Sequence, residues 1–422
     1  MSGPRSFLRT WILSLMAFAV LVVSVNLLAD PYDVFGTPRI AGFNARKPTA
    51  RDHAMLTKTY QVARAHPATV VIGSSPVYLG IDAFSPAWPA AMRPVYNYGI
   101  PGGYATLASL ETLREAIFAG GVKDAVVFLD FQNFLVPGGD SAAVTEESRR
   151  FRFAPDGSPN PYRPRQMAED MFLALGTMSA LTDSLITVAR QEKPVSLDMA
   201  RDGSATEADF INAANADGMH DMFAQKDMFE AERANRSKRA IAGWTGPLPG
   251  LDIVSRMIRV AHAHHVKLTL VIAPHHFDSL ELYWRDGLWP RIEQLKTELA
   301  ALAATPDHDV ILWDFMDYGT FTTEDVPLVG DRRTETHWFW EPTHFKKQVG
   351  SIMIQRMFDG DGPAFGAALT QANVAARNAD VRTERQAVVC GPDRKRPLTA
   401  LDKPPGDGCA SNGVVLRQNG PT

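Results

Sequence analysis

Cysteine is scarce in this chain: among 422 residues only Cys390 and Cys409 are cysteine, and both lie near the C-terminus. There is no CxxC pair and no Cys/His spacing typical of zinc, which excludes a cysteine-based zinc site. An excess of positive charge is also missing, because 43 Lys and Arg stand against 47 Asp and Glu, giving a net charge of −4. This balance argues against a nucleic-acid partner.

The chain does contain a long apolar run at its start, from Trp11 to Leu28, with only two serines and one asparagine as polar members besides Trp11 itself. At 1.5 Å per residue such a helix is about 27 Å long, close to the thickness of a bilayer core. Arg5 and Arg9 precede the run. Positive charge on this side predicts a cytoplasmic N-terminus and a single-pass protein of the cytoplasmic membrane.

Residues 1–29 are therefore predicted as an anchor that enters the lipid bilayer through residues 11–28. The run is long for the apolar part of a signal peptide, and Asn26-Leu27-Leu28 lacks the small residues of a cleavage site, but a cleaved signal peptide is the alternative. In both cases residues 30–422 are periplasmic or extracellular. In such a compartment Cys390 and Cys409 can form a disulfide.

The anchor is followed by a segment, residues 30–62, that is rich in Gly, Pro and Arg and is predicted as a membrane-proximal linker. Between residues 39 and 64 one acid, Asp52, accompanies six basic residues: Arg39, Arg46, Lys47, Arg51, Lys58 and Arg64. These side chains can rest on anionic headgroups or polymer. The alternative is a solvated helix face.

Strands and helices then alternate in a domain predicted over residues 63–362. Apolar, β-branched runs predict strands at 68–73, 94–97, 125–131, 266–273 and 310–315, and helical spacing predicts helices at 104–119, 251–265, 289–304 and 346–358. Near-continuous apolar strands between helices indicate a parallel sheet covered on both faces, a three-layer α/β/α fold. Residues 137–247 break the pattern and are predicted as a helical insertion, and residues 363–422 as a loosely packed tail.

In an open parallel sheet, ligands bind beyond the carboxyl ends of the strands. Polar residues and glycines fall at several of these ends and before the last helix: Ser74, Ser75, Asn97, Gly99, Gly102, Asp130, Gln132, Asn133, His275, His276, Asp314, Glu341 and His344. The topology can therefore gather residues that are far apart in the sequence.

Three of these residues form a possible serine-hydrolase set. A serine hydroxyl is a poor nucleophile until a base removes its proton, and the base needs an acid that holds it in one tautomer. Ser75 follows an apolar strand, and Glu341 lies three residues before His344. Ser75 is thus the candidate nucleophile, His344 the base and Glu341 the residue that orients it.

Four short blocks of this sequence resemble those of the SGNH (GDSL-like) hydrolase superfamily. They are Gly73-Ser74-Ser75, Asn97-Tyr98-Gly99-Ile100-Pro101-Gly102, Asn133, and Glu341-Pro342-Thr343-His344. The resemblance implies a five-stranded, flavodoxin-like parallel sheet, an oxyanion hole that includes Gly102 and Asn133, and no metal or organic cofactor. The sequence departs from the family pattern where Ser74 and Glu341 replace aspartates, and where the block around Asn133 lacks its Gly and Asp.

The combination of one anchor with an exported domain of this kind is similar to that of bacterial polysaccharide O-acetylation proteins. This similarity implies an acyl-ester hydrolase or O-acetyltransferase that acts on a cell-envelope or extracellular polysaccharide. The implied partners are a polysaccharide or acylated sugar and an envelope protein complex.

Other residues suggest binding roles. His275 and His276, at a strand's carboxyl end, are candidates for substrate contact. Trp338 and Trp340 lie beside the candidate base and can form an aromatic platform for sugar rings, although aromatic residues more often serve the core.

Two further functions stay open at the level of the sequence. One is a catalytically inactive SGNH-like protein that binds polymer or helps to assemble an envelope complex. The other is a metal-dependent hydrolase that uses Asp130, Asp314 and either His275 or His276.

Overall fold

Five parallel strands and one antiparallel strand form the central sheet of the computed structural model, which describes residues 4–102, 106–136, 147–192, 198–306, 309–360 and 362–391. The strand order is β2-β1-β3-β4-β5-β8. The strands are β1 (Thr69–Gly73), β2 (Val95–Gly99), β3 (Asp124–Leu129), β4 (Lys267–Ile272), β5 (Val310–Asp314) and β8 (Ala367–Leu369). The predicted α/β fold is confirmed, and the sheet, predicted as parallel throughout, is mostly parallel.

The sixth strand corrects the prediction of five. β8 runs antiparallel to β5, with Leu312 opposite Leu369. It comes from the segment predicted as a loose tail, and it is followed by helix α13 (Val374–Cys390), whose Val381 is fully buried. Three residues are too few to carry a periodic signal, so only pairing with β5 defines this strand.

Both faces of the sheet are covered, because alternate residues of each strand enter different cores. In β1, Val70 and Ile72 belong to one apolar cluster and Val71 to the other. The first core includes residues of α2 (Ala54–Ala65), α4 (Thr106–Ala119), α9 (Leu251–Ala263), α10 (Phe277–Arg285) and α11 (Trp289–Ala303). The second includes residues of α3 (Ser75–Gly80), α7 (Ala208–Asp217), α8 (Met219–Ala240) and α12 (Lys347–Phe358).

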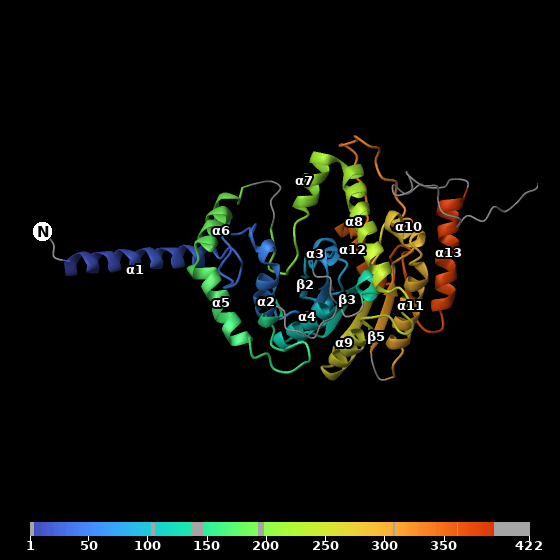
Figure 1. Cartoon of the computed structure of the whole chain (residues 1–422), viewed down its shortest axis with the longest axis horizontal. Coiled ribbons are helices and arrows are strands. Elements are labelled where there is room, and N and C mark those ends of the chain that lie inside the picture. Colours follow the sequence, from blue (N-terminus) through green and yellow to red (C-terminus); the bar gives the residue numbers. More distant parts are fainter. Residues whose placement is uncertain are drawn as a thin grey trace, which may run out of the picture.

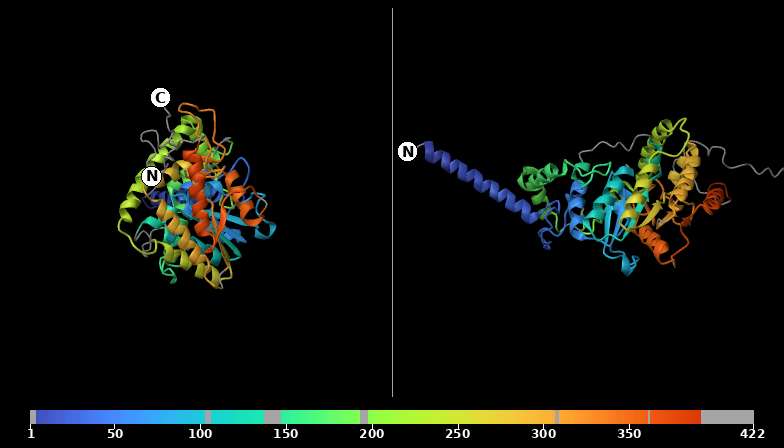
Figure 2. Two further views of the ribbon diagram at one scale, coloured as in Figure 1. Left: turned by 90° about the vertical axis from the view of Figure 1, so that its right-hand side faces the viewer. Right: turned by 90° about the horizontal axis from the view of Figure 1, so that it is seen from below.

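Helix α1 (Pro4–Ala29) projects from one end of this body (Figures 1 and 2). It contains the predicted stretch 11–28 and is long and apolar enough to cross a membrane. The described residues of the segment predicted as an insertion form four α-helices with separate positions. Helices α5 (Arg163–Gly176) and α6 (Met178–Ala189) pack on α1, whereas α8 packs against β6 (Phe339–Glu341) near the carboxyl ends of the strands.

The segment expected to be a basic linker is packed into the domain. Lys47 and Lys58 are fully buried. The Lys47 Nζ donates to the carbonyl oxygen of Ala29 at 2.7 Å, and the Lys58 Nζ donates to those of Asn97 and Gly203 at 2.6 and 2.7 Å. The prediction of headgroup contact or a solvated face is therefore wrong for these two lysines, because backbone carbonyls from distant segments capture them.

The predicted disulfide lies partly outside the described residues. Cys390 ends α13 and is disulfide-bonded, and Cys409 belongs to the part of the chain that the structure does not describe.

Gly350 allows α12 to lie directly against α3, the helix that begins with Ser75. A Cβ atom at this position would overlap the carbonyl oxygen of Gly80. Alanine would by itself favour the helix by about 1 kcal/mol. We nevertheless expect Gly350→Ala to lower the free energy of unfolding by about 1–3 kcal/mol, because the two helices must separate. Denaturant unfolding measures this change, with Gln348→Ala, at an exposed position of the same helix, as the control. Equal stability of the two variants would contradict the close packing.

Candidate active site

Ser75 lies at the carboxyl end of β1, at the point where the strand turns into a helix. Gly73 ends the strand, and a Cβ atom there would overlap the side chain of Val77. Ser74 keeps an extended conformation, with φ −93° and ψ −157°, and Ser75 is the first residue of α3. This turn presents the Ser75 side chain beyond the end of the sheet.

Glu341 and His344 face each other across a short hairpin. Strand β6 ends at Glu341, β7 (His344–Phe345) begins at His344, and the two residues are opposite each other in the antiparallel pairing. The carbonyl oxygen of Pro342, in the turn, accepts a hydrogen bond of 2.9 Å from the backbone N–H of His276, which ties the hairpin to the end of β4. The acid-x-x-His spacing seen in the sequence is thus a tight hairpin that places the acid beside the base.

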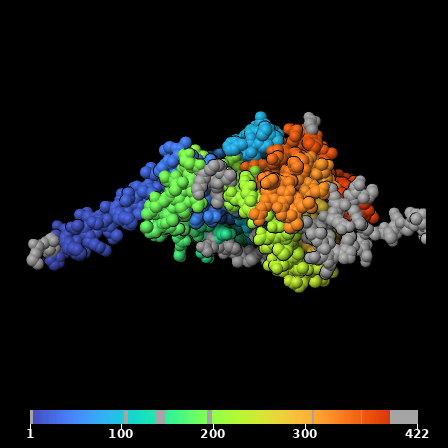
Figure 3. Space-filling model, turned by 90° about the horizontal axis from the view of Figure 1, so that it is seen from above, coloured from blue at the N-terminus to red at the C-terminus, as the bar shows by residue number. Residues whose placement is uncertain are grey.

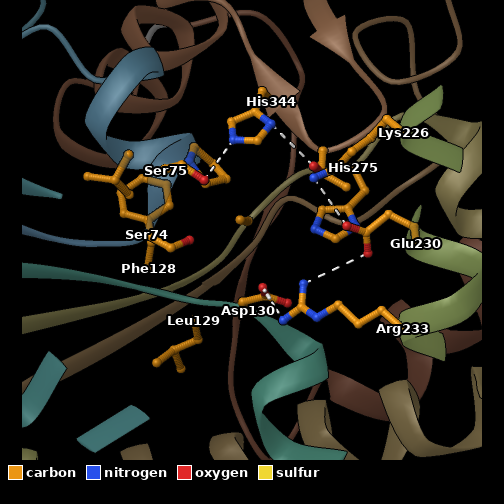
Figure 4. Close-up of a pocket in the computed structure, with 14 residues that line it drawn as sticks. Ser74, Ser75, Phe128, Leu129, Asp130, Lys226, Glu230, Arg233, His275 and His344 are labelled. Atoms are coloured by element: carbon orange, nitrogen blue, oxygen red, sulfur yellow. Dashed lines mark hydrogen bonds and ion pairs between the residues drawn. The ribbon is translucent and has the colours of Figure 1, made fainter. Parts of the chain in front are cut away.

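The structure brings these three residues into one hydrogen-bonded chain, and Figure 4 shows its Ser75–His344 part. The Nε2 of His344 lies 2.7 Å from the Oγ of Ser75, although the residues are 269 positions apart. The other ring nitrogen, Nδ1, contacts the Oε1 of Glu341. The hydroxyl of Thr343 donates to the same oxygen at 3.1 Å. This is the arrangement in which a carboxylate orients an imidazole that in turn activates a serine.

The electrostatics keep Glu341 ionised. Burial raises the pKa of its carboxyl group, but attraction from His344 and from Lys226, together with hydrogen bonds from His344 and Thr343, outweighs burial and lowers the pKa to about 2. The Nζ of Lys226 lies 4.0 Å from Oε2 of Glu341. The carboxylate therefore stays charged at neutral pH and can stabilise a positive imidazolium on His344.

A cavity beside Ser75 is formed by the start of α3, the ends of β3 and β4, the hairpin turn and one face of α8. The contribution of α8 consists of Lys226, Glu230 and Arg233. The sequence predicted a helical insertion in this part of the chain but not these three residues as site residues. Their spacing of four and three positions places them on one helical face, and this was the available signal.

Opposite charges alternate along the wall of this cavity. The Nη2 of Arg233 lies 3.1 Å from the Oδ2 of Asp130, and the Nζ of Lys226 lies 3.2 Å from the Oε1 of Glu230. Burial lowers the pKa of Arg233, but Asp130 and Glu230 raise it more. Burial likewise raises the pKa of Asp130, and Arg233 and His275 lower it more. Asp130 and Arg233 are therefore ionised, and with Lys226 and Glu230 they form a polar wall opposite the Ser75 hydroxyl.

Of the two histidines predicted to contact a substrate, His275 and His276, only His275 lines the cavity. Burial, as the largest cause, lowers its pKa to about 4, so the ring is neutral at pH 7. Its Nδ1 is 3.4 Å from the hydroxyl of Tyr283. His276 is fully buried and its Nε2 bonds to the carbonyl oxygen of Glu324 at 2.9 Å. His276 thus holds a loop in place and has no position from which to contact a substrate.

The predicted aromatic platform is not formed. Trp340 is only 4% exposed, and its Nε1 donates to Oε1 of Glu207 at 2.7 Å. The ammonium of Lys346 lies 3.9 Å from its ring centre. Trp338 is partly buried and packs edge-on against Phe321. The alternative of core packing therefore holds, because the hairpin beside the site is itself part of the second core.

The predicted oxyanion residues are not gathered around Ser75. Neither Gly102 nor Asn133 is among the residues that line the cavity. The Oδ1 of Asn133 accepts a hydrogen bond of 3.3 Å from Arg233. Gly102 has a φ of +71°. The amide of Asn97, from the same block as Gly102, donates to the carbonyl oxygens of Val77 and Ile81 and thereby supports α3. The physical reason for the difference at Asn133 is α8, whose Arg233 reaches across the end of β3.

The residues proposed as metal ligands in the alternative of a metal-dependent hydrolase do not lie together either. Asp130 and His275 lie at the cavity, but the carboxylate of Asp314 is buried and accepts a hydrogen bond of 2.7 Å from Lys296. Among the residues that the structure describes, no group of three His, Cys, Asp or Glu side chains is arranged to hold a metal ion.

Comparison of the chain with models of known protein families gives no match, and comparison with curated proteins gives none. The assignment of a function therefore depends on the geometry of the site.

Proposed function

We propose that this chain is a serine-dependent acyl-ester enzyme, either a hydrolase or an O-acetyltransferase, with Ser75 as nucleophile, His344 as general base and Glu341 as the residue that orients the base. The observation that carries the proposal is the 2.7 Å distance from Ser75 Oγ to His344 Nε2, with Glu341 on the opposite ring nitrogen. This class of catalyst is defined by its geometry, in which a nucleophile is hydrogen-bonded to a base and the base is hydrogen-bonded to an orienting acid.

The reaction would proceed in two halves. The Oγ of Ser75 attacks the carbonyl carbon of an ester while its proton passes to Nε2 of His344. The imidazolium, stabilised by Glu341, then gives this proton to the departing alcohol, which leaves an acyl group on Ser75. In the second half His344 takes a proton from the acceptor, whose oxygen attacks the acyl carbon. The bond from this carbon to Ser75 Oγ then breaks, and His344 returns the proton to Oγ, which restores the Ser75 hydroxyl. Water as acceptor makes the enzyme a hydrolase, and a sugar hydroxyl makes it a transferase.

The negative charge on the carbonyl oxygen needs donors in place of the expected asparagine. The N–H of Ser75 is at the start of α3 and has no acceptor within that helix. Lys226 and Arg233 supply cationic N–H groups to the same cavity. An oxyanion donor contributes about 3–4 kcal/mol of transition-state stabilisation in enzymes of this chemistry.

Two features support membership of the SGNH-like group. The blocks around Ser75 and His344 resemble the family's first and last blocks, and the five parallel strands follow the order 2-1-3-4-5, which is the flavodoxin-like order. The similarity to polysaccharide O-acetylation proteins makes an acylated cell-envelope or extracellular polysaccharide the proposed substrate, and an envelope protein complex the proposed partner. With α1 in the cytoplasmic membrane and Arg5 and Arg9 inside, the domain would act on its outer side.

One observation favours a second candidate, a non-catalytic SGNH-like protein that binds polymer. Asn133 is engaged by Arg233, and neither Asn133 nor Gly102 lines the cavity. A domain that has lost its oxyanion hole can keep its fold and its serine–histidine pair.

A covalent probe separates the two candidates. A fluorescent alkyl fluorophosphonate is expected to label the full-length protein at Ser75, because an activated serine displaces the fluoride and an ordinary serine does not. Labelling should be lost in Ser75→Ala and kept in Ser74→Ala, the matched neighbour. Failure of the unmodified chain to react, with the fold intact by circular dichroism, would favour the non-catalytic protein.

A further inference from the structure

The membrane-facing end of the molecule contains more apolar surface than α1 alone. Helices α5 and α6 lie across the last turns of α1, where the three helices contact one another (Figures 1 and 3). The contact is specific, because Asn26 of α1 is fully buried, donates to the carbonyl oxygen of Leu175 at 2.9 Å, and accepts from the hydroxyl of Ser184 at 2.9 Å. These bonds join α1 to the bend between α5 and α6.

The chain around this bend is unusually apolar for a surface segment. From Met171 to Val188 the only charged residue is Asp183, and its Oδ2 accepts a hydrogen bond of 2.5 Å from Tyr32 inside the protein. Three large side chains of this segment nevertheless point outward: Phe172 is 68% exposed, Met178 58% and Leu185 59%. Met178 and Leu185 are seven positions apart and share one face of α6. We name these three side chains the apolar collar.

The position of the apolar collar relative to the bilayer follows from the length of a membrane-spanning helix. A span of about 20 residues crosses the hydrocarbon core. Helix α1 ends at Ala29, and the residues of α1 buried against the rest of the protein are Val22, Asn26 and Ala29, in its last two turns. A span that ends near Ala29 therefore brings the collar to the level of the lipid headgroups.

We propose that the apolar collar inserts into the outer interface of the bilayer that α1 crosses, so that α5 and α6 lie in the membrane plane as a second, non-spanning attachment. The two helices are bent by 56° at Gly176-Thr177, and their inner faces bury Ala174, Ala180 and Ser184 against the protein. They lie on the membrane and do not cross it, because one face is committed to the domain and the other is apolar from Phe172 onward, whereas the exposed Arg165 and Glu169 precede it on α5. The attachment holds the domain at a set height and tilt, which limits the distance at which Ser75 meets its substrate. The proposal depends on α1 being in a membrane and is independent of the chemistry at Ser75.

Fluorescence of a lipid-sensitive label tests this attachment in the full chain. Phe172→Cys, Met178→Cys and Leu185→Cys are each labelled with the NBD fluorophore without reductant, so that the disulfide of Cys390 is kept. The proteins are reconstituted in vesicles of phosphatidylethanolamine and phosphatidylglycerol, with and without brominated acyl chains. Leu328→Cys is the control, because Leu328 is 81% exposed and its loop lies beside α8 and away from α5 and α6 (Figure 1). The unsubstituted chain serves as the labelling blank.

We expect the three collar labels to emit further to the blue than the Leu328 label and to be quenched several-fold more strongly by brominated lipid. Emission and quenching equal to those of the control would overturn the proposal. A blue shift without bromine quenching would also overturn it, because that result means that protein, such as a second copy of the chain, covers the collar. The three positions are all exposed, so retention of the fold in at least one variant keeps the test decisive.

Discussion

Loss of His344 is expected to remove nearly all acyl-transfer activity. Replacing it with alanine should lower the turnover of p-nitrophenyl acetate by about 10⁴–10⁶-fold, because Ser75 then has no base at hydrogen-bond distance. Ser75→Ala should cost about as much. The double variant should be no worse than either single one, because residues that act as a unit are not additive. The initial rate of p-nitrophenol release, measured for the two single variants and the double variant, gives these losses.

Glu341→Gln should give a smaller loss, about 10²–10⁴-fold, since glutamine can still contact the ring but cannot stabilise its positive charge. Because the pKa of Glu341 is lowered to about 2, its ionisation should not contribute to the pH dependence of the rate above about pH 4. Glu335→Gln is the matched control, because this side chain is 51% exposed and its ion pair, 3.2 Å to the Nζ of Lys346, lies outside the chain of Ser75, His344 and Glu341. A rate for Glu341→Gln equal to that of the control would remove Glu341 from the mechanism.

The second large effect concerns stability and a buried carboxyl group on α8. Asp227 is 4% exposed, and neither of its carboxyl oxygens has a hydrogen-bond partner among the described residues. Burial, followed by repulsion from Asp278, Glu341 and Glu230, raises its pKa to about 9. In the unfolded chain the pKa of an aspartate is about 4. Between these two values the folded protein holds a proton that the unfolded chain has released.

The sign of the effect follows from this difference in bound protons. The contribution of Asp227 to stability is fully present below about pH 4 and is lost as the pH rises toward 9, by at most about 1.4 kcal/mol per pH unit. Asparagine has nearly the shape of the protonated acid and does not titrate. We therefore expect Asp227→Asn to raise the free energy of unfolding at pH 8 by roughly 1–3 kcal/mol, and by much less at pH 5.

Denaturant unfolding of the detergent-solubilised full chain at pH 5 and pH 8 measures this difference. Asp221→Asn is the control, because Asp221 lies on the same helix with its side chain 57% exposed. Stability curves of Asp227→Asn and the unmodified protein that stay parallel from pH 5 to pH 8 would show that the folded protein does not hold a proton on Asp227 in this window.

Local sequence was sufficient for the five parallel strands of the sheet and for the three residues that form the hydrogen-bonded chain. Apolar runs of five or six residues predicted β1, β3, β4 and β5 within one or two positions, because a strand buried on both faces must be apolar throughout. Ser75 was found because it follows such a strand. Glu341 and His344 were found because a spacing of three positions lets one short turn place an acid beside a base.

Only the tertiary structure decided how the surroundings of that site are built. From the sequence alone Lys58 is expected at the surface. In the structure it is buried, and its Nζ donates to the carbonyl oxygens of Asn97 and Gly203. Arg233, which lies 100 positions from Asn133, takes up the amide that was expected to face the substrate. No periodicity or spacing encodes these contacts, because their partners come from other segments of the chain. A local pattern specifies what a segment can form, and the free energy of packing the segments together determines which polar groups find each other.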